Sequence, residues 1–111
     1  MPIADFMRAF PSIDIPVPDD IVTTNVIRSE AGLAVFFTFH KDFDLPAHAH
    51  KGQWGTVLKG EIALTIDGTT STFRTGESYS IPSGAVHSAR IAAGTVVLDV
   101  FEEPDRYPLR G

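Results

Sequence analysis

The chain contains no cysteine, which excludes disulfide bridges and any metal or redox site built on thiolates. It also lacks long apolar runs: stretches such as LAVFF are far shorter than the about 20 residues that cross a bilayer. The opening MPIADFMRAF has neither the basic start nor the long apolar segment of a secretory signal. We therefore expect a cytoplasmic protein without membrane association.

Basic residues are few and scattered along the chain. Nine Lys and Arg against 14 Asp and Glu give a formal net charge of −5. Proteins that bind nucleic acid usually gather Lys and Arg on one face, where they contact phosphates. The composition therefore predicts no nucleic-acid partner.

The length of 111 residues and the hydrophobic content of 43% predict one globular domain with its own core. We expect residues 19–102 to form the body of this domain and residues 103–111 to form a C-terminal tail. Residues 1–18 would form an N-terminal arm or edge strand, in which ADFMRAF suits a short helix and SIDIPV a strand.

Eight Pro and nine Gly divide the chain into short runs rich in Val, Ile, Thr and Phe, which suit β-strands. Asp67-Gly68 is a strong two-residue hairpin signal between two such runs. Many short strands with frequent turns are typical of an all-β sandwich or barrel. The predicted strands are Ile21–Arg28, Leu33–His40, Gln53–Leu58, Glu61–Ile66, Thr70–Arg74, Ser78–Ile81, Val86–Ile91 and Thr95–Glu102.

Two of the four histidines lie one residue apart in PAHAHKGQWG, at His48 and His50. On an extended strand, residues two apart point to the same face, so both imidazoles would project together. Neutral imidazole is a common protein ligand for first-row transition metals. By itself the pair has two interpretations, half of a metal site or two exposed histidines in a loop.

A second stretch, GESYSIPSGAVH, carries Gly76, Pro82, Gly84 and His87. Together the two stretches resemble the cupin superfamily. In the second cupin motif a Gly is followed, after five residues, by Pro-x-Gly and, after two more, by a His, and this chain matches each position. Ile91 stands where the motif often has Asn.

The first cupin motif is matched by His48, His50 and the closing Gly60, with two departures. Asp42 occupies the leading Gly position. Six residues separate Gln53 from Gly60, which places Gln53 at the position of the acidic metal ligand. The two motifs and the hairpin between them cover residues 48–91.

The resemblance implies a jelly-roll β-barrel, the double-stranded β-helix of cupins, with a divalent transition metal inside. The metal, which could be Fe, Mn, Ni, Zn or Cu, would be held by His48, His50, Gln53 and His87. A neutral glutamine leaves the ion its full +2 charge, which favours an anionic substrate and Lewis-acid chemistry. It also removes the base that the equivalent glutamate supplies in some cupin dioxygenases. Alternatively, Gln53 hydrogen-bonds a metal-bound water instead of ligating.

Aromatic strand residues are the expected walls of such a pocket. Cupin pockets are lined by residues of this kind, and we expect Phe39 and Phe101 to take this role. Trp54 adjoins Gln53 and could line the pocket, pack in the core or contact a second subunit.

Asp99 is unusual because it lies in the apolar run TVVLDVFEE, where an unpartnered carboxylate would be costly to bury. It could pair with Arg74 or Arg90, face solvent, orient a histidine, or act as the base. His40 is expected at the surface.

The resemblance leaves three classes of function open. The first is a metal-dependent enzyme that acts on a small oxygenated molecule by dioxygenation, isomerisation or lyase chemistry. The second is a binding protein for a small anion or sugar acid, and the third is a structural cupin with a degenerate site. Small cupins commonly dimerise and exposed sheet edges need covering, so we expect a homodimer.

Overall fold

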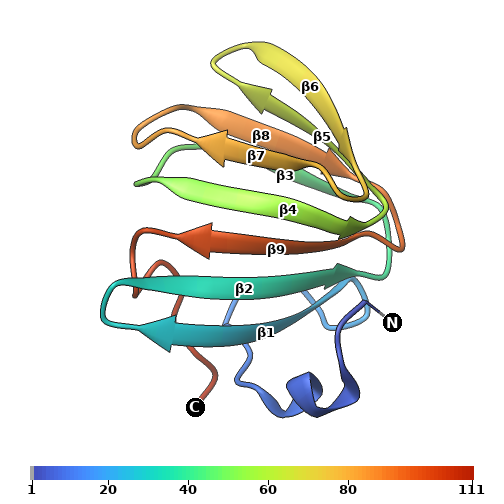
Figure 1. The fold of residues 1–111 in the computed structure, drawn as a ribbon, viewed down its shortest axis with the longest axis vertical. Helices are drawn as coiled ribbons and strands as arrows, with labels where there is room; N and C mark the ends of the chain where they lie inside the picture. The colour runs from blue at the N-terminus through green and yellow to red at the C-terminus, as the bar shows by residue number, and fades with distance from the viewer. Residues whose placement is uncertain (1) are drawn as a thin grey trace.

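The computed structural model describes residues 2–111, which form nine strands in two antiparallel sheets and one short 3-10 helix (Figure 1). The five-stranded sheet has the order β1-β2-β9-β4-β7 and the four-stranded sheet the order β3-β8-β5-β6. This is the predicted all-β jelly-roll barrel. The strands are β1 (Val22–Ser29), β2 (Gly32–Phe39), β3 (Phe43–His48), β4 (Gln53–Lys59), β5 (Glu61–Ile66), β6 (Thr69–Arg74), β7 (Ser78–Ile81), β8 (His87–Ile91) and β9 (Val96–Phe101).

Each of the eight predicted strands is present, with both ends within one residue of the expected position. The strand ends are predictable because the turns between strands depend on residues that are adjacent in the sequence. At the β5–β6 hairpin Asp67 and Gly68 both have positive φ, 47° and 84°, as the predicted two-residue turn requires.

Strand β3 was not predicted. Its sequence FDLPAH contains Pro46, which lacks a backbone N–H and is tolerated only at sheet edges or bulges. Both conditions are met here, because β3 is an edge strand and its pairing with β8 shifts register between Leu45 and His48. The irregularity aims His48 into the barrel at the end of the strand.

The N-terminal arm contains the expected short helix at Asp5–Ala9. The strand expected in SIDIPV does not form, since the segment makes only one bridge, between Ile13 and Leu109. Ile13 is nevertheless fully buried. Among the described residues, no helix has the length and apolar character to cross a membrane.

The C-terminal tail leaves β9 and folds back against the barrel. The Tyr107 ring packs edge-on against Phe101 and Phe37, with ring centroids 5.5 Å and 6.4 Å apart. This packing holds the adjacent Arg106 at the barrel interior, where it lines a cavity.

The outer face of the five-stranded sheet is uncharged over two adjacent rows of paired residues. It carries three exposed apolar side chains, Ile27 (53%), Trp54 (43%) and Val100 (38%). Trp54 therefore points away from the barrel interior. The two rows are Ile27, Ala34, Val100, Trp54 and Ser80, and Asn25, Phe36, Leu98, Thr56 and Ser78.

Candidate metal centre

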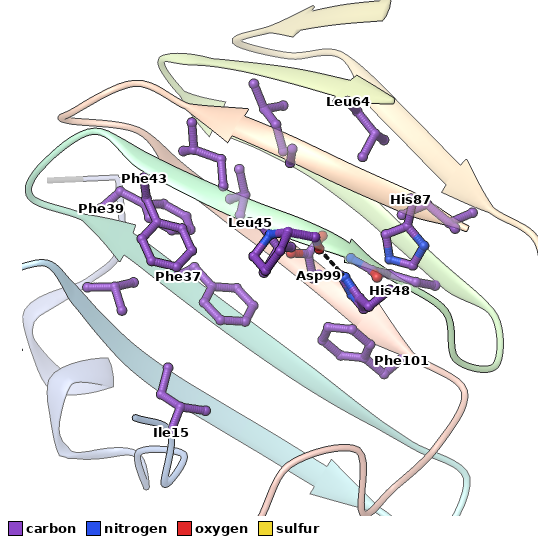
Figure 2. A pocket seen from close by; sticks show the side chains of 18 of the residues that line it. Ile15, Phe37, Phe39, Phe43, Leu45, His48, Leu64, His87, Asp99 and Phe101 are labelled. Carbon is purple, nitrogen blue, oxygen red and sulfur yellow. Dashed lines mark hydrogen bonds between the residues drawn. The ribbon is translucent and has the colours of Figure 1, made fainter. Parts of the chain in front are cut away.

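A cavity of about 420 Å³ lies between the two sheets. Its polar side chains include His48, His87, Asp99, Gln53 and Arg106, whereas most of the remaining wall is aliphatic or aromatic. Figure 2 shows His48, His87 and Phe101 at one end of the cavity, away from the cluster of Phe37, Phe39 and Phe43.

Three histidines meet at the polar end. His48 ends β3 and pairs in register with His87, the first residue of β8, while His50 lies in the loop just after β3. Their ring centroids are 4.2 Å (His48 and His87), 4.7 Å (His50 and His87) and 5.1 Å (His48 and His50) apart. One ring nitrogen from each lies within 4.8 Å of the others, a spacing compatible with a shared metal ion.

Hydrogen bonds set the tautomer of all three rings. Each Nδ1 lies 2.7 to 2.9 Å from a backbone carbonyl oxygen one or two residues away. Because a carbonyl only accepts, each Nδ1 must carry the proton, which leaves each Nε2 with a free lone pair. The accepting carbonyls belong to Pro46 for His48, Lys51 for His50 and Ala85 for His87.

The Nε2 atoms of His50 and His87 are buried and make no hydrogen bond. A buried acceptor without a partner is costly and needs an explanation such as an ion. A divalent transition metal fits this donor set, since it accepts imidazole lone pairs and the Nδ1–H···O bonds orient the rings as in metal-bound histidines.

The local electrostatics favour neutral imidazoles. Burial holds the pKa of His50 and of His87 below its usual range, and the positive charge of Arg106 lowers both pKa values further. Since the ordinary histidine pKa is about 6.5, both rings are neutral at pH 7 and can donate to a metal.

Asp99 on β9 is buried and faces the same cavity. The Tyr79 hydroxyl donates a hydrogen bond of 2.6 Å to its Oδ1. Burial raises the pKa of Asp99 to about 6, while hydrogen bonds from Tyr79 and the Gln53 side chain oppose that rise. Burial and the neighbouring Asp99 also raise the pKa of Tyr79, so its hydroxyl keeps its proton.

Asp99 does not pair with Arg74 or Arg90, the two arginines that the sequence suggested as partners. Arg74 pairs with Glu61 at 3.1 Å and Arg90 pairs with Asp44 at 3.5 Å, all at the surface. Asp99 does not orient a histidine either, because all three Nδ1 atoms contact backbone carbonyls.

Gly55 makes the contact between Asp99 and Tyr79 possible. It lies between them in register across three neighbouring strands, on the row that faces the interior. A Cβ at this position would overlap both Asp99 Oδ1 and the Tyr79 ring. The sequence offered no sign of this requirement, because a glycine in a strand is also compatible with a bulge or a turn.

Arg106 is a further cavity residue that the sequence did not single out. Its guanidinium lies 4.4 Å from the centroid of the Tyr107 ring, and its Nε is buried without a hydrogen-bond partner. Within residues 2–111, Arg106 forms no ion pair. No linear motif marks it, since its place in the cavity follows only from the return of the tail.

The other predicted residues divide between the inside and the outside of the barrel. Phe39 and Phe101 line the cavity, and the Phe101 ring centroid lies 5.6 Å from that of His50. Trp54 is absent from the cavity wall and lies on the outer face. His40 is exposed outside the cavity, with its Nε2 3.0 Å from Thr23 Oγ1.

Comparison with known proteins gives the same family and fold as the two histidine motifs and the two sheets. A family model described as Cupin domain matches residues 35–101. An RmlC-like cupin from Shewanella frigidimarina NCIMB 400 is 25% identical, with a TM-score of 0.74 over 88% of this chain and 86% of that one. KdgF from Halomonas sp. is 20% identical, with a TM-score of 0.72 over 86% of each chain.

A third similar structure is Bacillus subtilis oxalate decarboxylase, described as having Mn(II) centres. It is 22% identical, with a TM-score of 0.66, and the alignment covers 76% of this chain but 26% of the decarboxylase. No match was found among curated proteins.

We expect the protein to bind one divalent transition metal ion and the His87→Ala variant to bind it far more weakly. Loss of a group that only orients a ligand typically costs about 10–100-fold in metal affinity, and loss of a ligand should cost at least as much. Calorimetric titration of protein purified without a metal-affinity tag measures this.

The matched control is His40→Ala, which removes the one histidine outside the cluster and should leave metal affinity unchanged. If the wild type binds none of Fe, Mn, Ni, Cu and Zn, the centre does not exist. Equal losses in both variants would show that the metal binds elsewhere.

Proposed function

Since the chain belongs to the cupin family, we propose that it is a metal-dependent cupin that binds a small oxyanion, such as a carboxylate or enolate, and acts on it. The observation that carries this proposal is the convergence of ring nitrogens from His48, His50 and His87. Two of them, Nε2 of His50 and of His87, are buried without a hydrogen bond, and Arg106 beside them forms no ion pair within the described residues. The reaction would be of the dioxygenase, isomerase or lyase type.

We assign the metal ligands as His48, His50, His87 and Gln53. The Gln53 side chain lies within hydrogen-bonding reach of Asp99. Because a carboxylate accepts, an amide that hydrogen-bonds Asp99 does so through its NH₂ group, which would leave the Gln53 oxygen for the metal. When bound, the metal would act as a Lewis acid that polarises an oxygen of the bound molecule.

Arg106 supplies the second positive group for the oxyanion. It lines the cavity near the histidines and has no counter-ion among the described residues. A planar guanidinium binds carboxylates through two parallel hydrogen bonds, a geometry that a lysine does not offer. Packing on Tyr107 fixes the guanidinium in place.

Asp99 favours turnover over storage of the anion. A protein that only held an anion would gain nothing from a buried carboxyl in the same cavity, since like charges repel. A carboxyl that can give or take a proton has a use in a reaction. Because Gln53 cannot act as a base, Asp99 is the acid–base group that we assign, with Tyr79 holding its Oδ1 in place.

We also propose that the protein is a homodimer joined through the outer face of the five-stranded sheet. The chain carries a net charge of −5, so two copies repel over most of their surfaces. The N-terminal arm covers Asn25 at one end of this face. Over the rest of the two rows a contact between two copies would place no like charges opposite each other, and it would bury Trp54, Ile27 and Val100. Aromatic residues at the centre of such a face commonly dominate binding energy.

The Gln53→Glu variant is expected to bind divalent metal at least tenfold more tightly than the wild type. A carboxylate adds a negative charge to the ligand set, which strengthens its attraction to the cation. The same charge should weaken binding of acetate to the metal-loaded protein. Both affinities can be measured by calorimetry.

The matched variant is Gln53→Ala, which removes the oxygen and should weaken metal binding. Unchanged metal affinity in both variants would show that Gln53 is not a ligand.

Replacement of Arg106 by Gln should weaken acetate binding to the metal-loaded protein at least tenfold. A hydrogen bond to a charged group contributes about 1.5–3 kcal/mol, and tenfold corresponds to about 1.4 kcal/mol. Metal affinity should not fall, because Arg106 repels the cation. Arg110→Gln, in the same tail but paired with Asp19 at the surface, is the control and should leave both affinities unchanged.

The Trp54→Asp variant should be monomeric at concentrations where the wild type is a dimer, because a charge would be buried at the centre of the interface. Light scattering coupled to size exclusion measures the mass of each. Trp54→Phe keeps the apolar contact and should remain dimeric. A monomeric wild type at micromolar concentration would contradict the assignment.

A further inference from the structure

The cavity continues well beyond the metal centre, into a part walled only by apolar side chains among the described residues. Phe37 and Phe39 stack there with centroids 6.0 Å apart, and Phe43 follows at 5.9 Å from Phe39. Figure 2 shows these rings across the cavity from His48 and His87. Leu64 and Ala89 form part of the opposing wall, from β5 and β8.

This space is unusual for a protein interior. Cores are packed to crystal-like density and hold few voids larger than a water molecule. The cavity of about 420 Å³ instead falls in the range of about 300–1,000 Å³ that is typical of small-molecule sites. A largely apolar cavity of this size with a few polar groups at one end is the usual form of a small-molecule site, which indicates that a ligand occupies it.

The apolar wall also excludes one class of ligand. A hydroxyl group placed among Phe37, Phe39 and Leu64 would lose its hydrogen bonds to water and find no side-chain partner there. Tyr79 also lines the cavity, but its hydroxyl already donates its hydrogen bond to Asp99. A polyhydroxylated molecule therefore suits the polar end but not the rest of the cavity.

We propose that the ligand is an amphipathic oxyanion, with a carboxylate-like head at the histidines and Arg106 and an unsubstituted apolar body, a short alkyl chain or a single aromatic ring, against Phe37, Phe39 and Phe43. The assignment of the head rests on the proposed function. The assignment of the body rests on the cavity wall alone.

Four probes separate these two parts in calorimetric titrations of the metal-loaded protein. They are acetate (head only), hexanoate (head and apolar body), glucuronate (head and hydroxylated body) and 1-hexanol (apolar body only). Each methylene removed from water contributes about fourfold in affinity. Hexanoate should therefore bind at least tenfold more tightly than acetate and glucuronate, and more tightly than 1-hexanol.

A cavity-filling variant locates the body. Ala89→Leu places a larger side chain at the apolar wall and should reduce hexanoate affinity at least tenfold while leaving acetate affinity within twofold. Ala63→Leu makes the same change on the outward side of β5 and should alter neither. The ratios among the four probes on the wild type do not depend on whether Ala89→Leu folds.

The outcomes distinguish the inference from the proposed function. Glucuronate binding as tightly as hexanoate, or hexanoate no tighter than acetate, overturns the apolar body and leaves the oxyanion head intact. Binding of 1-hexanol as tight as that of hexanoate, with no binding of acetate, overturns the head and supports the body. Failure of all four probes to bind overturns both.

Discussion

The centre depends on three hydrogen bonds from imidazole Nδ1–H groups to backbone carbonyls. Each bond places the proton on the nitrogen that faces the backbone and leaves Nε2 with a lone pair that a metal ion can accept. The accepting carbonyls lie within two residues of their histidines, so the local backbone orients the rings before any ion binds. After the bulge in β3 the pairing with β8 resumes at His48 and His87, which places their ring centroids 4.2 Å apart.

Two ionisable side chains other than histidine line the mainly apolar cavity. Arg106, from the tail, supplies a positive charge, and Asp99, from β9, supplies a carboxyl group. The carboxyl is accommodated because Gly55 leaves room for Tyr79 to reach it. The guanidinium is held by the Tyr107 ring rather than by an acid. In the proposed function, Arg106, which forms no ion pair within residues 2–111, would bind the incoming anion, and the buried carboxyl of Asp99 would exchange a proton with it.

The sequence was sufficient for most of the fold because the signals involved are local. Glycine turns and runs of β-formers placed eight strands to within one residue, and both histidine motifs were visible. Strand β3 was missed because Pro46 argues against a strand unless the edge position and the bulge are known. Asp99 was noticed as an anomaly, but its partners Tyr79 and Gln53 lie on other strands and could not be inferred.

By itself the sequence determined the alternation of each strand, the turns between strands and the spacing of His48, His50 and His87, since these depend on residues close together in the chain. Only the tertiary structure decided that the tail returns Arg106 to the barrel and that Trp54 faces outward. It also decided that the interior is left partly unfilled. Inward-facing residues such as Phe37 and Phe39 alternate with outward-facing ones in the same way whether they pack in a core or line a cavity. The alternation in the sequence shows which face of a strand is inward, but it does not show whether that face contacts other side chains or an open space.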